Sequence, residues 1–128
     1  LCDALLADGW HVVCVDNFLT GRRENLRHLR ADPRFDLVAH DVVEPLPAAL
    51  APPRLGRVDA VFNLACAASP PLYQADPEHT MLTNVLGTRN LLRLAESSGA
   101  RFLQALGCHQ VQGFLFSGKP YVIMMKVL

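Results

Sequence analysis

The sequence predicts an α/β protein built on a doubly wound parallel sheet. Short apolar runs rich in β-branched residues, at 11–15 and 58–65, alternate with stretches of helical periodicity. The first run is continuously apolar from residue 12 to residue 15, which is typical of a strand covered on both faces. The connections between the elements are mostly short, as in a sheet whose strands and helices alternate. The chain has 128 residues, so a single small domain is expected.

The N-terminal third predicts a helix, a strand and a second helix. Residues 1–8 have leucines at helical spacing and are followed by Gly9, a typical helix stop. The run "HVVCV" at 11–15 is the first predicted strand. Residues 20–32 have two leucines three apart among charged residues, which predicts a surface helix ending near Pro33.

The rest of the chain continues the alternation. Strands are predicted at 35–41, 58–65 and 101–106, and the first two are joined by a Pro- and Ala-rich connection with room for one short helical turn. Between the last two lies a long predicted helix. Asp76 is its expected cap, and Gly99 is its expected end.

Composition and charge exclude several classes of protein. Twelve basic and twelve acidic residues cancel and form no long run of one sign, so no nucleic-acid or membrane partner is expected. The four cysteines are widely spaced without a CxxC pair, so neither a zinc site nor a disulfide framework is expected. No apolar run is long enough to span a bilayer, and the first residues do not resemble a signal peptide. We therefore expect a cytoplasmic protein with reduced thiols that acts on small molecules.

Ligands of a parallel sheet bind beyond the carboxyl ends of its strands, which directs attention to Asp16 after the first strand. An ionised carboxylate can accept hydrogen bonds from both ribose hydroxyls, and its charge repels the extra phosphate of NADP, so NAD is the expected cofactor. In the alternative reading, Asp16 only caps the turn to Gly21. The basic pair Arg22 and Arg23 could instead receive a 2′-phosphate.

Asp41 follows the second strand and could accept a hydrogen bond from an adenine amine, with the backbone of Val42 facing the ring. A turn cap before Pro45 is the alternative for Asp41.

Alanines at 65, 67 and 68 have small side chains, which would let the backbone lie close to a cofactor. The alternative is that these alanines only pack within a loop. No histidine has a Ser or Cys partner at a spacing that would indicate a catalytic base. The histidines are therefore expected at the surface or in turns; they are His11, His28, His40, His79 and His109.

Four segments carry a resemblance to a known family: "VCVDNFLTGRRENL", "HDVVEPL", "NLACAASPPLYQADPEHT" and "LTNVLGTRNLLRLA". Through them residues 1–103 resemble the extended short-chain dehydrogenase/reductase family of NAD-dependent epimerases and dehydratases, and within it the UDP-glucuronate decarboxylases. The resemblance implies a Rossmann-like sheet, NAD as cofactor and a nucleotide sugar as substrate. In that family NAD oxidises the sugar at C4, the carboxylate leaves as carbon dioxide and the hydride returns.

The same resemblance implies roles for individual residues. It places Asp16, Asn17, Phe18, Thr20 and Gly21 around the adenosine ribose, Asp41 and Val42 at the adenine, Leu64, Cys66 and Thr83 along the rest of NAD, and Asn90 near the sugar nucleotide. No catalytic or metal-binding residue is carried over.

The sequence also departs from the family pattern. The glycine-rich turn and first strand would precede Leu1, so the sheet is expected to lack its first strand and to leave a strand edge exposed. Ala67, Leu72 and Leu82 stand where the family often has proline, a polar residue and lysine.

Residues 104–128 lack the family's Tyr-x-x-x-Lys pair, since Tyr121 and Lys126 are five apart. We therefore expect a partial NAD-binding domain at 1–103 followed by an unrelated or frameshifted tail. The segment "QALGCHQVQGFLFSGKP" resembles the end of an EAL-type phosphodiesterase.

Two functions are compatible with these observations. The chain is expected to be a fragment of an NAD-dependent nucleotide-sugar decarboxylase that lacks the catalytic residues and does not turn over by itself. The alternative is a non-catalytic binding module that pairs, as a homodimer or with a relative, through the helix at 77–97.

Overall fold

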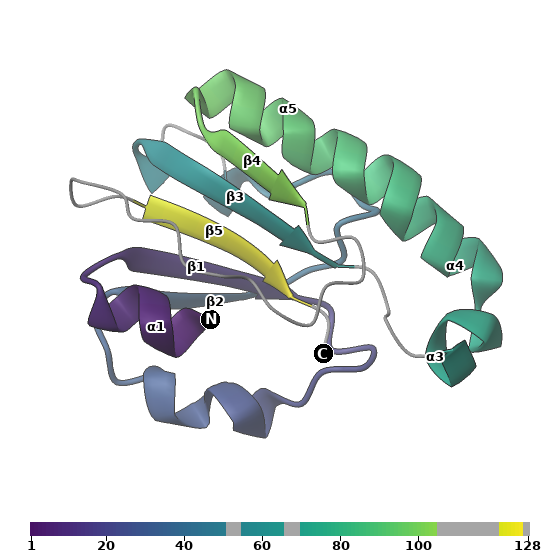
Figure 1. Ribbon diagram of the computed structural model, residues 1–128, viewed down its shortest axis with the longest axis horizontal. Helices are drawn as coiled ribbons and strands as arrows, with labels where there is room; N and C mark the ends of the chain where they lie inside the picture. The colour runs from purple at the N-terminus through teal and green to yellow at the C-terminus, as the bar shows by residue number, and fades with distance from the viewer. Residues whose placement is uncertain (51–54, 66–69, 105–120, 127–128) are drawn as a thin grey trace.

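The computed structural model describes residues 1–50, 55–65, 70–104 and 121–126. Strands and helices alternate along the chain, with helices on both sides of a central sheet (Figure 1). The strands are β1 (His11–Asp16), β2 (Phe35–Ala39), β3 (Val58–Leu64), β4 (Arg101–Gln104) and β5 (Tyr121–Lys126). All of their pairings are parallel, which confirms the predicted fold class.

The order of the strands in the sheet is β2-β1-β5-β3-β4. The last strand along the described chain therefore lies in the centre, where Ile123 is aligned with Val13 of β1 and Val61 of β3. This is the position of the first strand in a doubly wound sheet of order 3-2-1-4-5-6. The expectation that β1 would lack a partner on this side is wrong, because the backbone of 121–126 supplies one. The division of the chain at residue 103 stays a prediction, although 121–126 belong to the same sheet.

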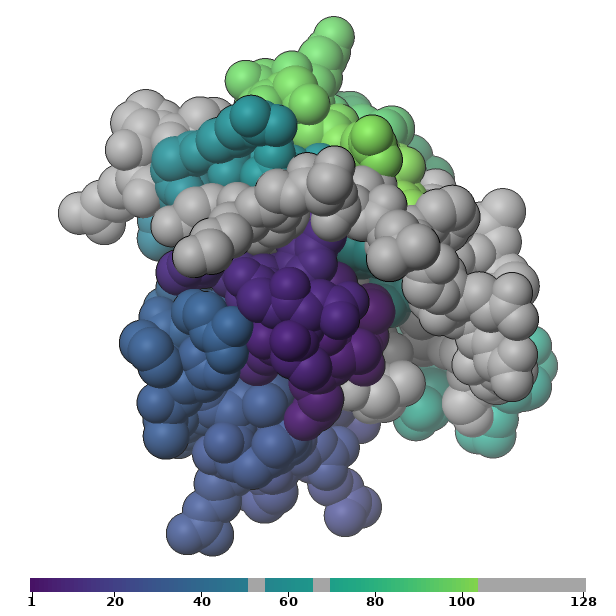
Figure 2. Space-filling model, turned by 60° about the vertical axis from the view of Figure 1, so that its left-hand side comes forward, coloured from purple at the N-terminus to yellow at the C-terminus, as the bar shows by residue number. Residues whose placement is uncertain are grey.

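One face of the sheet is covered by the N-terminal elements α1 (Cys2–Ala7) and η1 (Arg23–Leu29) (Figure 1). Both bury leucines in the same apolar cluster, and Figure 2 shows the N-terminal residues packed beside those of η1. η1 is a 3-10 helix, and it lies within the surface helix predicted at 20–32. Its buried residues Leu26 and Leu29 are three apart, which matches the three-residue repeat of a 3-10 helix.

The other face is covered by a long helical segment that replaces the single helix predicted there. It consists of α4 (Pro77–Leu82), the π-turn η3 (Thr83–Gly87) and α5 (Thr88–Ser98). A short helix, α3 (Pro70–Ala75), comes before it, and η2 (Ala48–Leu50) is the short turn expected in the Pro- and Ala-rich connection. Leu91, Leu94 and Ala95 of α5 are buried against the valines of β1 and β3.

The predicted helix ends are confirmed by the backbone. The Asp76 carboxylate accepts a hydrogen bond of 2.9 Å from the backbone N–H of His79, as expected of an N-cap. Gly99 ends α5 with φ 64°, a left-handed conformation that glycine adopts without a steric penalty. In the part of the chain that the structure describes, no helix has the length and apolar character needed to cross a membrane.

Candidate functional site

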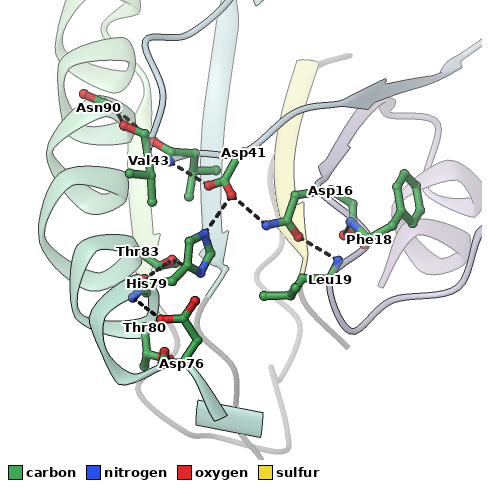
Figure 3. Close-up of polar contacts among 12 residues, drawn as sticks. Asp16, Phe18, Leu19, Asp41, Val43, Asp76, His79, Thr80, Thr83 and Asn90 are labelled. Carbon is green, nitrogen blue, oxygen red and sulfur yellow. Dashed lines mark hydrogen bonds and ion pairs between the residues drawn. The ribbon is translucent and has the colours of Figure 1, made fainter. Parts of the chain in front are cut away.

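The turn after β1 is organised by its own side chains (Figure 3). Oδ1 of Asp16 accepts a hydrogen bond of 2.7 Å from the backbone N–H of Phe18, and Oδ1 of Asn17 accepts one of 3.0 Å from Leu19. Phe18 has φ 58°, an uncommon value for a residue with a side chain. A Cβ at Gly21 would lie 2.7 Å from Oδ2 of Asp16, so only glycine fits there without a shift. The turn-capping reading of Asp16 is therefore part of the structure, and a ribose contact through Oδ2 stays a prediction.

Asp41 follows β2 and lies beside this turn, because β1 and β2 are neighbours in the sheet. The amide of Asn17 donates to Oδ2 of Asp41 over 2.9 Å, and the backbone N–H of Val43 donates to Oδ1 over 3.0 Å. The second contact is the turn cap considered as an alternative for Asp41. The geometry thus brings Asp16, Asn17 and Asp41 together at one edge of the sheet.

His79 of α4 reaches the same carboxylate from the other side (Figure 3). Its Nε2 lies 2.8 Å from Oδ2 of Asp41, and both side chains are 28% exposed. An ionised carboxylate has no proton to donate, so Nε2 is the donor. Burial opposes ionisation of Asp41, but the hydrogen bonds from Val43, Asn17 and His79 outweigh it and lower the pKa of Asp41.

The expectation that the histidines lie at the surface or in turns missed this contact. A local signal was present, since His79 and Thr83 are four residues apart and share one face of a helix. The Thr83 hydroxyl donates to the carbonyl of His79 over 2.8 Å. Thr83, a predicted site residue, and His79 therefore form one unit on the helical segment.

A cavity of about 160 Å³ opens beside these groups. It has polar and apolar walls formed by Asn17, Leu19, Thr20, Ala65, Leu72, Ala75, Asp76, His79, Thr80 and Thr83. A cavity of roughly 150 Å³ holds a benzene-sized ring, so this one has room for a single ring rather than a whole dinucleotide. The buried Thr20 hydroxyl has no hydrogen-bond partner in the described structure, which leaves it available to a ligand hydroxyl.

The remaining predicted site residues that the structure describes do not line the cavity of about 160 Å³. The Asn90 amide donates to the carbonyls of Val42, Val43 and Glu44 over 2.9, 3.3 and 3.2 Å, so in this structure it holds the loop after β2. Val42 is buried in the core. Leu64 packs against the apolar cluster under α1. Cys66, Ala67 and Ala68 are outside the described residues.

Metal ligands do not gather in this part of the chain. Over 1–50, 55–65 and 70–104, no three His, Cys, Asp or Glu side chains lie close enough to hold a metal ion. The acids and the histidine at the sheet edge are instead paired with protein donors and acceptors. The arrangement suits hydroxyl and amine groups of an organic ligand.

Comparison with protein families matches residues 1–113 to the model described as "NAD dependent epimerase/dehydratase family". The chain belongs to this family. UDP-glucuronic acid decarboxylase 1 of Arabidopsis thaliana is 50% identical over 103 residues, covering 80% of this chain and 22% of that protein. UDP-glucuronic acid decarboxylase 1 of Danio rerio is 46% identical over 105 residues, covering 82% of this chain and 23% of that protein. The chain thus spans about a fifth of the length of the curated relatives it matches.

These matches also correct one expectation. The family model extends to residue 113 and so covers part of the segment that resembled an EAL-type phosphodiesterase. That resemblance is not supported.

Proposed function

We propose that this chain holds the adenosine end of NAD at the carboxyl edge of β1 and β2. The Oδ2 atom of Asp16 would accept hydrogen bonds from the ribose hydroxyls, and the Thr20 hydroxyl would find its missing partner on the ligand. Asp41 would accept from the adenine amine. The observation that carries this proposal is the convergence of Asp16, Asn17 and Asp41 beside a ring-sized cavity.

When bound, NAD would accept a hydride from a substrate and later return it. The relatives' names point to UDP-glucuronate as the substrate of a complete enzyme. Among the residues whose side chains the structure describes, neither a tyrosine nor a lysine lines the cavity. We therefore propose that this chain by itself binds the cofactor without releasing carbon dioxide from UDP-glucuronate. Detectable carbon dioxide from the purified chain supplied with NAD and UDP-glucuronate would contradict the second part.

Calorimetric titration of the purified chain with NAD and NADP tests the cofactor site. The unchanged chain is expected to prefer NAD. In Asp16→Asn the amide oxygen can still accept the Phe18 N–H, so the turn is kept while the negative charge is lost. We expect the preference for NAD over NADP to fall roughly tenfold, equivalent to about 1.4 kcal/mol. Asp36→Ala, at an exposed position of β2, is the matched control and should keep the preference. Equal binding of both dinucleotides by the unchanged chain would overturn the assignment of Asp16.

A specific observation favours the dimerisation module as a second function. Met81, Val85 and Leu92 are exposed and fall on one face of the segment from α4 to α5. We propose that this stripe pairs with the same stripe of a second copy. Val85→Glu should then convert a dimer to a monomer in light scattering coupled to size exclusion, while Glu96→Gln, also exposed on this segment, should not. A monomeric unchanged chain would refute homodimerisation.

A cytoplasmic location, expected from the cysteine pattern, remains part of the proposal.

A further inference from the structure

We infer that His79 is a positioning residue that holds the Asp41 carboxylate in the orientation required to recognise an adenine amine. The inference rests on the proposed function, because it assumes that the adenosine end of NAD binds at this edge. It goes further by naming a residue on α4 as a determinant of base specificity.

The hydrogen bonds of Asp41 leave little freedom to its carboxylate. Oδ1 accepts from the Val43 N–H, and Oδ2 accepts from both the Asn17 amide and His79. A carboxylate offers about four acceptor positions, so these donors use three and leave one on Oδ1. Donors on both oxygens fix the plane of the group, and the remaining acceptor position then has one direction.

His79 is itself held firmly. Its backbone N–H donates to the Asp76 cap, and its carbonyl accepts from Thr83. The ring Nδ1 lies 3.5 Å from the Thr83 hydroxyl. The imidazole is therefore a fixed donor supplied by the helical segment rather than a mobile surface group.

The contact between His79 and Asp41 also lies between two hollows. His79 lines the cavity of about 160 Å³, whereas Asp41 lines a smaller one of about 10 Å³ with room for roughly one water. Asn17, Ala65 and Thr83 line both. Asp41 lines only the smaller of these two hollows, so a base in the larger cavity would have to extend its amine past the shared residues Asn17, Ala65 and Thr83 to reach the carboxylate.

A fixed Asp41 carboxylate would distinguish adenine from hypoxanthine. Adenine presents a hydrogen-bond donor at C6, and hypoxanthine presents a carbonyl acceptor at the same place. A fixed carboxylate favours the amine and repels the carbonyl, because the mismatched pair leaves buried acceptors facing each other. A carboxylate released by loss of His79 can turn away, and the repulsion is then reduced.

The experiment compares binding of NAD and nicotinamide hypoxanthine dinucleotide to the 128-residue chain by calorimetry. The unchanged chain should prefer NAD at least tenfold. His79→Leu and His79→Asn, in which the side chain lacks a donor or is too short to reach Asp41, should reduce the preference to threefold or less. His79→Gln, which can still donate, should keep most of it. His28→Leu, which removes a histidine paired with Asp3 on the opposite side of the sheet, is the matched control and should have no effect.

The outcomes separate the inference from the proposed function. A merely structural role for His79 would weaken both dinucleotides equally and leave their ratio unchanged, and that result would overturn the inference alone. Failure of the unchanged chain to bind NAD would overturn both. If His79→Leu does not fold, as judged by circular dichroism, the polar variant His79→Asn carries the comparison.

Discussion

The two halves of the molecule bring different side chains to the carboxyl edge of the sheet. The first half, residues 1–50, contributes the acceptors Asp16, at the end of β1, and Asp41, after β2. The second half, residues 55–104, contributes His79 and the hydroxyl of Thr83 from the helical segment beside β3. The site exists only where the halves meet, so neither half alone would carry it.

The halves are also joined in two different ways. Among the described strands, those of the first half are joined to those of the second half through β5, which pairs with β1 on one side and with β3 on the other. Two polar side-chain contacts also join the halves. His79 contacts Asp41, and the Asn90 amide donates to a carbonyl in the loop after β2. The following changes test how much each connection contributes.

Ile123→Pro should have the largest effect, because proline removes the backbone donor from the strand that connects the halves. We expect the free energy of unfolding to fall by at least about 3 kcal/mol, because the lost ladder hydrogen bond leaves a carbonyl without its donor at a cost of about 1–3 kcal/mol and the proline ring also distorts the strand. Urea denaturation followed by circular dichroism measures it. Ile123→Val keeps the N–H and is the control. A proline variant as stable as the valine variant would show that β5 does not connect the halves.

Asn90→Leu should come next. The leucine has a similar size but leaves the carbonyls of Val42, Val43 and Glu44 without this donor. We expect a loss of about 1–3 kcal/mol in the free energy of unfolding. Arg89→Leu, at the exposed neighbouring position, should change it much less. Equal effects in the two variants would argue against a role for Asn90 in joining the halves.

Acid should weaken the polar connection at Asp41. The pKa of Asp41 is lowered in the folded protein, so its ionised form contributes stability above the unfolded pKa of 3.8. That contribution is lost as the pH falls through the lower, folded pKa. Asp41→Asn should therefore lose less stability than the unchanged chain between pH 5 and pH 3, measured by urea denaturation. Parallel losses in the two proteins would contradict the assignment.

The smallest effect is expected for the other histidine–aspartate pair, which lies within the first half. Nε2 of His28 lies 2.6 Å from Oδ1 of Asp3, but the side chains of His28 and Asp3 are 59% and 68% exposed. His28 lowers the pKa of Asp3, although solvent screens an exposed pair of this kind. We expect Asp3→Ala to change the free energy of unfolding by no more than about 0.5 kcal/mol. A larger loss would mean that exposure is a poor guide to the strength of such a pair in this protein.

Local features of this structure could be predicted from the sequence. Gly99 and the Asp76 cap mark helix ends because each acts on its own few residues. The apolar run at 11–15 predicted a buried strand, and it is one. Asp16 and Asp41 were each expected at the carboxyl end of a strand, and the structure places Asp16 at the end of β1 and Asp41 just after β2.

Features that depend on distant segments could not be predicted. The run at 121–126 has the composition of a strand, but a short apolar run carries no information about which strands it will pair with. His79 meets Asp41 only because the helical segment folds back over the sheet. The π-helical segment at Thr83–Gly87 was missed because its apolar spacing differs little from that of an α-helix. Its last residue, Gly87, packs closely against Val42 of the first half. A Cβ at Gly87 would lie 2.7 Å from Val42.

The central place of β5 has a consequence for synthesis on the ribosome. Val13 of β1 cannot pair with Ile123 of β5 until Ile123 has been synthesised and has left the ribosome. Until then the nascent chain exposes the inner borders of β1 and β3, which are templates for pairing with other chains. Contacts between such distant segments also slow folding. Translation of this protein should therefore include an interval in which these strand borders are open to pairing with other chains.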